Sequence, residues 1–303
     1  MGSKSRFSNQ VTKSVMSESE TATRIGRGTG GREQVRLLVD GHVHVHPAHD
    51  EAALVENAYQ KLRGFGAGLP TLFLTECAGV SVFEKWRDGS ARVDVRRTGE
   101  GESIVVNERL LVLAGRQVVT RERIEVLALA TNSRIKDGMT LEETLDEVGQ
   151  AGAVAVLPWG LGKWLGARGK RVEEVAANRR LLLGDNAGRP GFWPEPGIFK
   201  KHPVLPGTDP LKAAGEELLA GGYGFRLDCE IELDRPAESI RRALLELTPG
   251  GPPRVGRRIA FPDSIMRQFA HLMPGTSPRG SRQGQPAQPS AVAAESASDA
   301  PRA

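Results

Sequence analysis

Six runs of apolar residues recur along the chain between about residues 35 and 273, without the polar alternation of a half-exposed strand. A strand that is apolar at successive positions is buried on both faces, as in a largely parallel sheet covered by helices. The predicted strands span residues 35–46, 71–78, 124–130, 153–158, 180–186 and 203–210.

Segments with helical spacing of apolar residues separate these strands. Thr140 opens the sequence T-L-E-E, which has the spacing of a capping box, and Gly152 fits a helix C-cap. The predicted helices span residues 50–62, 140–152, 171–179, 211–222 and 236–247. Residues 92–115 alternate too much for a helix and indicate an antiparallel β insertion.

This order of elements predicts an α/β barrel-like domain over residues 35–273. Residues 1–34 are rich in Ser, Thr, Gly and Arg without periodicity, and residues 274–303 are of low complexity. Both segments are predicted to be disordered tails.

Composition and charge add few constraints, since 39% of the 303 residues are apolar and 26% are charged. The net charge of +4 lies in the tails, because residues 1–34 carry +3 and residues 272–303 carry +1. The neutral middle offers no electrostatic footprint, so nucleic acid is not expected as a partner. No secretory segment and no apolar run of roughly 18–20 residues is found, which favours a cytoplasmic protein without membrane contact.

The strongest chemical signal is the run D-G-H-V-H-V-H at residues 40–46, which holds three of the six histidines. Alternate residues of a strand share a face, so His42, His44 and His46 are expected to point the same way. Imidazoles in this arrangement bind divalent cations such as Zn, Mn or Fe, and carboxylates complete the shell. The alternative is a polar strand end whose histidines are hydrogen-bonded to backbone or solvent.

The run, followed by P-A-H-D, resembles the first motif of the PHP (polymerase and histidinol phosphatase) domain family, D-x-H-x-H with an Asp shortly after it. The order of the later segments is also similar, over about residues 35–225. The resemblance implies a distorted, TIM-like (β/α) barrel that holds two or three metal ions and hydrolyses phosphate esters.

The later motifs depart from the family pattern. Glu76-Cys77 stands in place of Asp-His, Gln117 in place of the metal-bridging Glu, and Pro158-Trp159 in place of His-Pro. Gln and Trp supply neither an anionic nor a basic ligand atom, so we expect a divergent member without the full trinuclear centre.

The remaining candidates define a smaller site. The predicted metal ligands are His42, His44, Glu76, Asp185 and Asp209, and the predicted catalytic residues are His46 and Asp50. Each acidic ligand follows an apolar strand, and α/β barrels place their active sites at that rim. For Asp185 and Asp209 the alternative is a loop Asp in an Asx-turn or a helix cap.

Two further sets of residues flank the expected rim. Basic residues of the loops, Arg189 among them, could receive a phosphate or carboxylate, or they are solvated surface. Trp159, Trp164 and Trp193 could line a pocket, or they cover the barrel mouth.

The function expected from these residues is metal-dependent hydrolysis of a phosphoester or amide-type bond in a small molecule, by water activated on at least one divalent metal ion. The rival hypothesis, based on Gln117 and Trp159, is a pseudo-enzyme that kept the fold, lost the full metal centre and binds a ligand or a protein.

Overall fold

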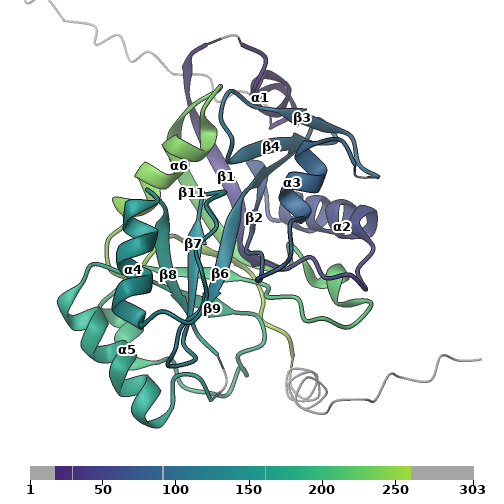
Figure 1. The fold of residues 1–303 in the computed structure, drawn as a ribbon. Coiled ribbons are helices and arrows are strands. Elements are labelled where there is room, and N and C mark those ends of the chain that lie inside the picture. The colour runs from purple at the N-terminus through teal and green to yellow at the C-terminus, as the bar shows by residue number, and fades with distance from the viewer. Residues whose placement is uncertain (1–17, 29, 91, 161, 261–303) are drawn as a thin grey trace, which may run out of the picture.

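The computed structural model describes residues 18–28, 30–90, 92–160 and 162–260, which form two β-sheets flanked by helices (Figure 1). The larger sheet is centred on β1 (Arg32–Val43), which is parallel to β2 (Leu69–Leu74) and antiparallel to β11 (Tyr223–Glu232). Its other strands are β3 (Val95–Arg97), β4 (Ser103–Val106), β5 (Leu110–Leu113) and β12 (Arg254–Gly256), and the order is β12-β11-β1-β2-β5-β4-β3. The antiparallel β3–β4–β5 unit confirms the insertion predicted over residues 92–115.

The smaller sheet contains five strands, in the order β10-β9-β8-β7-β6. They are β6 (Gly115–Val119), β7 (Glu125–Leu129), β8 (Val154–Pro158), β9 (Leu182–Asn186) and β10 (Val204–Gly207). The parallel arrangement predicted from the apolar runs is correct for β8, β9 and β10 but wrong for β7, which is antiparallel to both neighbours. The chain reverses tightly before β7, where Thr120 N donates to Ile124 O at 2.9 Å and Arg123 has a φ of 61°.

The predicted TIM-like (β/α) barrel is wrong, because the described strands form two sheets that do not close. Both edges of β1 are paired, with β11 and β2, and both edges of β2 are paired, with β1 and β5. Neither strand therefore has an edge left for continuous pairing with the smaller sheet. The sheets approach each other at the isolated bridge between Glu76 and Arg116, and at a hydrogen bond of 2.8 Å from Asp209 N to His42 O.

Buried side chains fill three layers. The first cluster lies between the sheets and includes Leu37 and Phe73 from the larger sheet and Leu127 and Val156 from the smaller one. A second cluster joins the outer face of the smaller sheet to the helices α4 (Leu141–Gln150) and α5 (Gly166–Asn178). A third joins the larger sheet to α2 (Glu51–Arg63) and α3 (Val82–Arg87).

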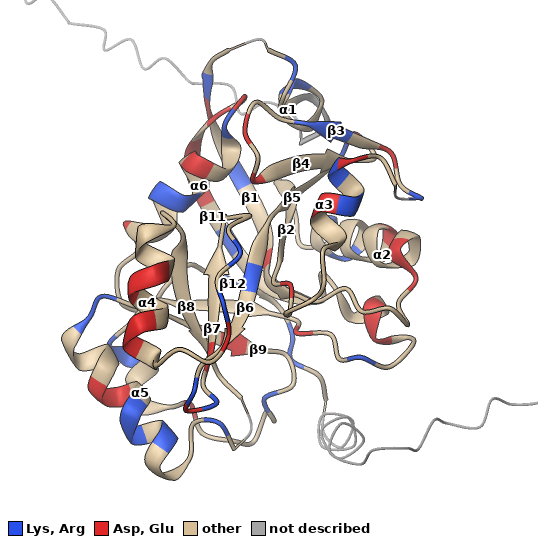
Figure 2. Ribbon diagram, in the orientation of Figure 1, with Lys and Arg blue, Asp and Glu red and all other residues tan. Residues whose placement is uncertain are grey.

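Most of the helices lie where local sequence signals predict them. The predicted capping box at Thr140 is confirmed, and Asp50 caps α2 by accepting from the amides of Ala52 and Ala53. α5 and α6 (Pro236–Leu245) lie on predicted segments. The charged residues of α4 are all acidic, whereas α5 carries both basic and acidic residues (Figure 2). The helix predicted over residues 211–222 is wrong: the segment holds only the 3-10 turn η2 (Glu216–Leu219). Gly215 and Gly221 have φ of 91° and 77°, values that interrupt an α-helix.

The disorder predicted for residues 1–34 is wrong for the part that the structure describes. α1 (Glu18–Arg24) and the start of β1 lie there, and Ala22 and Ile25 are buried in the core between the sheets. These two apolar residues stand close together in a polar segment, too few for a periodic signal. Residues 1–17 and the tail predicted over 274–303 lie outside the described residues. Among the described helices, none has the length and apolar character that a membrane span needs.

Candidate metal centre

A buried carboxylate joins the end of β1 to the loop after β10. Asp40 Oδ1 accepts from the amides of Thr208 (2.9 Å) and His42 (3.3 Å), and Oδ2 accepts from Thr208 Oγ1 (2.5 Å) and the amide of Gly221 (2.8 Å). Burial raises the pKa of Asp40 to about 6, although these hydrogen bonds oppose the rise. The four bonds bring the backbone at His42 next to the backbone at Thr208, and therefore next to Asp209.

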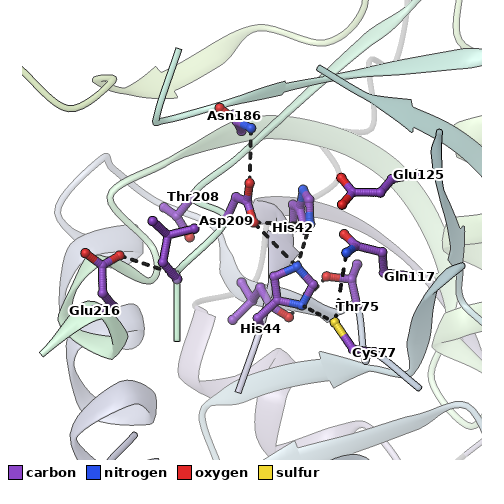
Figure 3. A network of polar contacts seen from close by, with 12 residues as sticks. His42, His44, Thr75, Cys77, Gln117, Glu125, Asn186, Thr208, Asp209 and Glu216 are labelled. Carbon is purple, nitrogen blue, oxygen red and sulfur yellow. Dashed lines mark hydrogen bonds and ion pairs between the residues drawn. The ribbon is translucent and has the colours of Figure 1, made fainter. Parts of the chain in front are cut away.

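Three side chains converge at this junction (Figure 3). His42 Nε2 and His44 Nε2 lie 3.0 Å apart, and Asp209 Oδ1 lies 3.6 Å from the first and 3.4 Å from the second. Both imidazoles are 6% exposed, whereas the Asp209 side chain is 23% exposed and opens the group to solvent. Asp209 has a φ of 51°, a left-handed conformation that is uncommon for a non-glycine residue.

The donor atoms of this group fit a divalent cation. One ligand atom from each of His42, His44 and Asp209 lies within 4.8 Å of the others, so the group could hold a metal ion. Burial, aided by the charge of His42, lowers the pKa of His44 to about 3, which keeps the ring neutral with a nitrogen lone pair to donate. Two imidazoles and one carboxylate are a donor set of catalytic zinc sites, which leave one position open for water or substrate.

A second layer of polar groups surrounds these ligands (Figure 3). Cys77 Sγ lies 3.9 Å from His44 Nδ1, and Gln117 Nε2 donates to the same sulfur at 3.9 Å. Asn186 Nδ2 donates to Asp209 Oδ2 at 3.1 Å and to the carbonyl oxygen of Trp159 at 2.8 Å. Groups in such positions orient metal ligands. Sequence reasoning treated Cys77 and Gln117 as departures from a ligand pattern and did not select Asn186, which follows Asp185 at the end of β9.

The other predicted ligands lie elsewhere. Glu76 accepts from the amide of Phe83 at 2.6 Å, and burial raises its pKa. Asp185 Oδ1 and Oδ2 accept from Arg189 at 2.6 and 3.1 Å, and Oδ2 also accepts from Tyr223 Oη at 2.7 Å. Of the residues that the structure describes, only His42, His44 and Asp209 form a group with metal-ligand spacing.

The two predicted catalytic residues, Asp50 and His46, also differ in where the structure places them. Asp50 caps α2, with its Oδ1 3.0 Å from the amide of Ala52. β1 ends at Val43, so strand alternation no longer sets the direction of His46. The His46 ring lies 5.4 Å from the His44 ring, between centroids, and burial lowers the pKa of His46 to about 4. His49 holds this loop, because its Nδ1 accepts from the amide of His46 at 3.2 Å and its Nε2 lies 2.7 Å from Leu211 O.

No protein-family model matches the chain, and no curated protein matches it either. Among solved structures, the chain is similar to PsfC from Pseudomonas syringae, with a TM-score of 0.49 and 13% identity over 79% of this chain and 100% of PsfC. It is also similar to the novel lesion-specific endonuclease PfuEndoQ from Pyrococcus furiosus, with a TM-score of 0.48 and 14% identity over 73% of this chain and 57% of that one.

A third structure is endonuclease Q in complex with a 27-mer duplex that has an abasic lesion at the active site, with a TM-score of 0.43 and 14% identity over 73% of this chain and 58% of the endonuclease. This chain therefore spans little more than half the length of endonuclease Q. Because the TM-scores are below 0.5, these similarities assign no activity to the chain.

The expectation that excluded nucleic acid as a partner is corrected here, because the similar structures include an endonuclease bound to a DNA duplex. The exclusion rested on the net charge of the middle of the chain. Net charge describes the sum over a domain, whereas phosphate binding depends on local clusters of cations. Arg254, Arg257 and Arg258 form such a cluster within a neutral domain.

Proposed function

We propose that this protein is a metal-dependent hydrolase in which His42, His44 and Asp209 hold one divalent cation. The observation that carries the proposal is the convergence of two imidazoles and one carboxylate from the end of β1 and the loop after β10. The resemblance of residues 40–50 to the first PHP motif supports the same chemistry. A divalent cation in this position supplies a Lewis acid and lowers the pKa of water that reaches it.

The protein itself supplies proton transfer and orientation. His46 is neutral near pH 7, because its pKa is lowered to about 4, and it lies beside His44. We assign it the role of accepting a proton from the attacking water. Asn186 orients the carboxylate of Asp209 through the hydrogen bond to Oδ2. Asp50 is not given a catalytic role in this scheme, because its carboxylate caps α2.

The substrate class proposed is a phosphoester or amide-type bond, and phosphodiesters of nucleic acids belong in the panel. The competing proposal is a pseudo-enzyme that binds a ligand. It is favoured by Gln117 and Trp159, which stand where the PHP pattern has ligands: Gln117 contacts Cys77, and Trp159 is bonded to Asn186 through its backbone.

The metal content of the purified protein distinguishes the hydrolase from the pseudo-enzyme. The native protein should retain about one divalent ion per chain, and the His42→Ala/His44→Ala double variant should retain none, by elemental analysis after gel filtration. His202→Ala, which removes a histidine of the loop after η1 (Gly197–Lys200), is the matched control and should retain the metal. A native protein that takes up no Zn, Mn or Fe refutes the hydrolase proposal.

Activity is then measured on chromogenic phosphomonoesters and phosphodiesters and on cyclic amides. Loss of turnover in the double variant, with turnover kept in His202→Ala, supports the hydrolase. A loaded native protein that turns over none of these substrates favours the pseudo-enzyme.

A further inference from the structure

A second cluster of charged residues lies on the opposite face of β9 from the candidate metal centre. Asp185 directly precedes Asn186, so the two side chains leave the strand on opposite sides. Asp185 is 1% exposed and accepts hydrogen bonds from Arg189 and Tyr223. The Arg189–Asp185 pair is therefore a satisfied buried ion pair that forms the floor of the cluster.

Two more guanidinium groups approach the same carboxylate without donating to it. Arg254 Nη1 lies 4.0 Å and Arg258 Nη1 lies 3.9 Å from Asp185 Oδ2, beyond hydrogen-bond distance. Arg254 Nη1 donates instead to Glu195 Oε1 at 2.5 Å. Arg258 Nη1 is buried and has no hydrogen-bond partner in the part of the chain that the structure describes. A buried cationic donor without a hydrogen-bond partner would be stabilised by an anionic acceptor.

A cavity of about 560 Å³ opens against these groups. The charged residues among its described lining are Arg254, Arg257 and Arg258. Phe192, with a side chain 64% exposed, and Tyr223 supply aromatic surface in the same lining. The cavity thus places a planar apolar ring beside three guanidinium groups.

The charges of the cluster leave an excess of two positive charges. The four arginines, Arg189 and the three of the lining, face two carboxylates, Asp185 and Glu195. Arg257 is exposed; its backbone amide donates to Gly222 O at 3.2 Å, and its side chain has no hydrogen bond or ion pair with another described residue. A phosphate monoester carries a negative charge close to the one that would neutralise this excess. Guanidinium groups also donate paired hydrogen bonds to phosphate oxygens.

We propose that this arginine cavity, lined by Phe192, Tyr223, Arg254, Arg257 and Arg258, binds a nucleotide unit, with its phosphate on the arginines and its base stacked on Phe192. Stacking of bases on exposed aromatic rings beside a cationic surface is a general mode of nucleotide-strand binding. The unit belongs either to a free nucleotide or to a nucleic-acid strand. The inference goes beyond the proposed function, because this cavity lies on the opposite face of β9 from the candidate metal centre and includes none of its ligands in the described lining.

The test is calorimetric titration of the full chain, in EDTA, with adenosine monophosphate, adenosine, ribose 5-phosphate and a short single-stranded oligodeoxynucleotide. Adenosine monophosphate should bind at least about tenfold more tightly than adenosine, which lacks the phosphate, and than ribose 5-phosphate, which lacks the base. Arg257→Ala should weaken binding of adenosine monophosphate about tenfold, since it removes one charged donor pair. Phe192→Ala should weaken binding of adenosine monophosphate but leave that of ribose 5-phosphate unchanged.

Arg32→Ala is the matched control. It removes one exposed arginine at the start of β1, which is paired with Glu232 at the end of β11 remote from Tyr223, and its binding should equal that of the native chain. Arg257→Ala is preferred to Arg258→Ala because Arg258 faces the buried Asp185, and melting temperatures confirm that each variant folds.

Equal affinities for adenosine monophosphate and adenosine, or an Arg257→Ala variant that binds like the native chain, overturn the inference. Tighter binding of the oligonucleotide, with strong salt dependence, assigns the ligand to a nucleic-acid strand, and equal binding assigns it to a free nucleotide. The His42→Ala/His44→Ala variant should bind adenosine monophosphate normally in EDTA. Failure of the metal-dependent hydrolase and failure of the nucleotide site are therefore separate results.

Discussion

Asp40 is the residue on which the geometry of the candidate metal centre depends most. Its two oxygens accept four hydrogen bonds from three different segments of the chain, and all four donors are buried with it. A carboxylate is suited to this position because it accepts on both oxygens, whereas an amide accepts on only one.

Asp40→Asn should therefore destabilise the protein. One oxygen becomes an NH2 group that faces the donors of Thr208 or Gly221, and the loss should be about 1–3 kcal/mol of unfolding free energy. Urea denaturation measures it. Asp88→Asn, at an exposed residue that pairs with Arg97, is the control and should change stability by less than about 0.5 kcal/mol. Equal effects of the two substitutions would show that the Asp40 network contributes nothing specific.

Titration of the same region predicts how stability depends on pH. The pKa of Asp40 is raised to about 6, so its contribution is full below its unfolded value of 3.8 and is lost as pH rises through 6. The pKa values of His44 and His46 are lowered to about 3 and about 4 from 6.5, so their contributions are present above 6.5 and are lost as pH falls.

Between pH 6 and pH 4 the two histidines outweigh the single aspartate, because unfolding then takes up about one net proton. In EDTA, the unfolding free energy should therefore fall by on the order of 1 kcal/mol for each pH unit as the pH is lowered from 6 to 4. His46→Ala should make the profile nearly flat there. A native profile that rises toward pH 4 would contradict the prediction.

At the scale of the elements, the start of helix α4 is fixed by hydrogen bonds between residues close together in the sequence. Thr140 Oγ1 accepts from the amide of Glu143 at 3.2 Å, and Glu143 Oε2 accepts from the amide of Thr140 at 2.8 Å. The helix buries Leu141, Leu145 and Val148 against the smaller sheet. Both the start of this helix and its buried face could be predicted from the sequence, because the interactions that set them join residues a few positions apart.

Thr140→Ala should cost about 1 kcal/mol of unfolding free energy by removing the cap, as measured by urea denaturation. Thr140→Ser keeps the hydroxyl and should cost little. If both variants lose the same amount, the cap hydroxyl is not the cause.

At the scale of the whole molecule, the two sheets meet where β10 passes β1. A Cβ atom at Gly207 would lie 2.5 Å from the Cβ atom and from the amide nitrogen of His42, so only glycine permits this approach. The hydrogen bond from Asp209 N to His42 O lies at the same crossing. The contact between the sheets therefore also determines the distance between the metal ligands.

Gly207→Ala should separate β10 from β1, lower unfolding free energy by roughly 2 kcal/mol and weaken metal retention at least about tenfold. The measurements are urea denaturation and elemental analysis. Gly149→Ala is the matched control, because its Cβ enters open space on α4, and it should stabilise the protein slightly. Full metal retention in Gly207→Ala would show that the crossing does not position Asp209.

The sequence by itself determined the features that depend on neighbouring residues: the apolar strands, the start of α2, the capping box of α4, and the pair His42 and His44 at the end of β1. Only the tertiary structure decided that the strands form two sheets, because this depends on which strand edges are already paired. It also decided between the two acidic candidates. Asp185 and Asp209 each follow an apolar run, but β9 directs Asp185 to Arg189, and the crossing of β10 over β1 brings Asp209 to the histidines. Contacts between residues more than 160 positions apart leave no periodic trace in the sequence, so the choice of Asp209 among the acidic candidates could be made only from the fold.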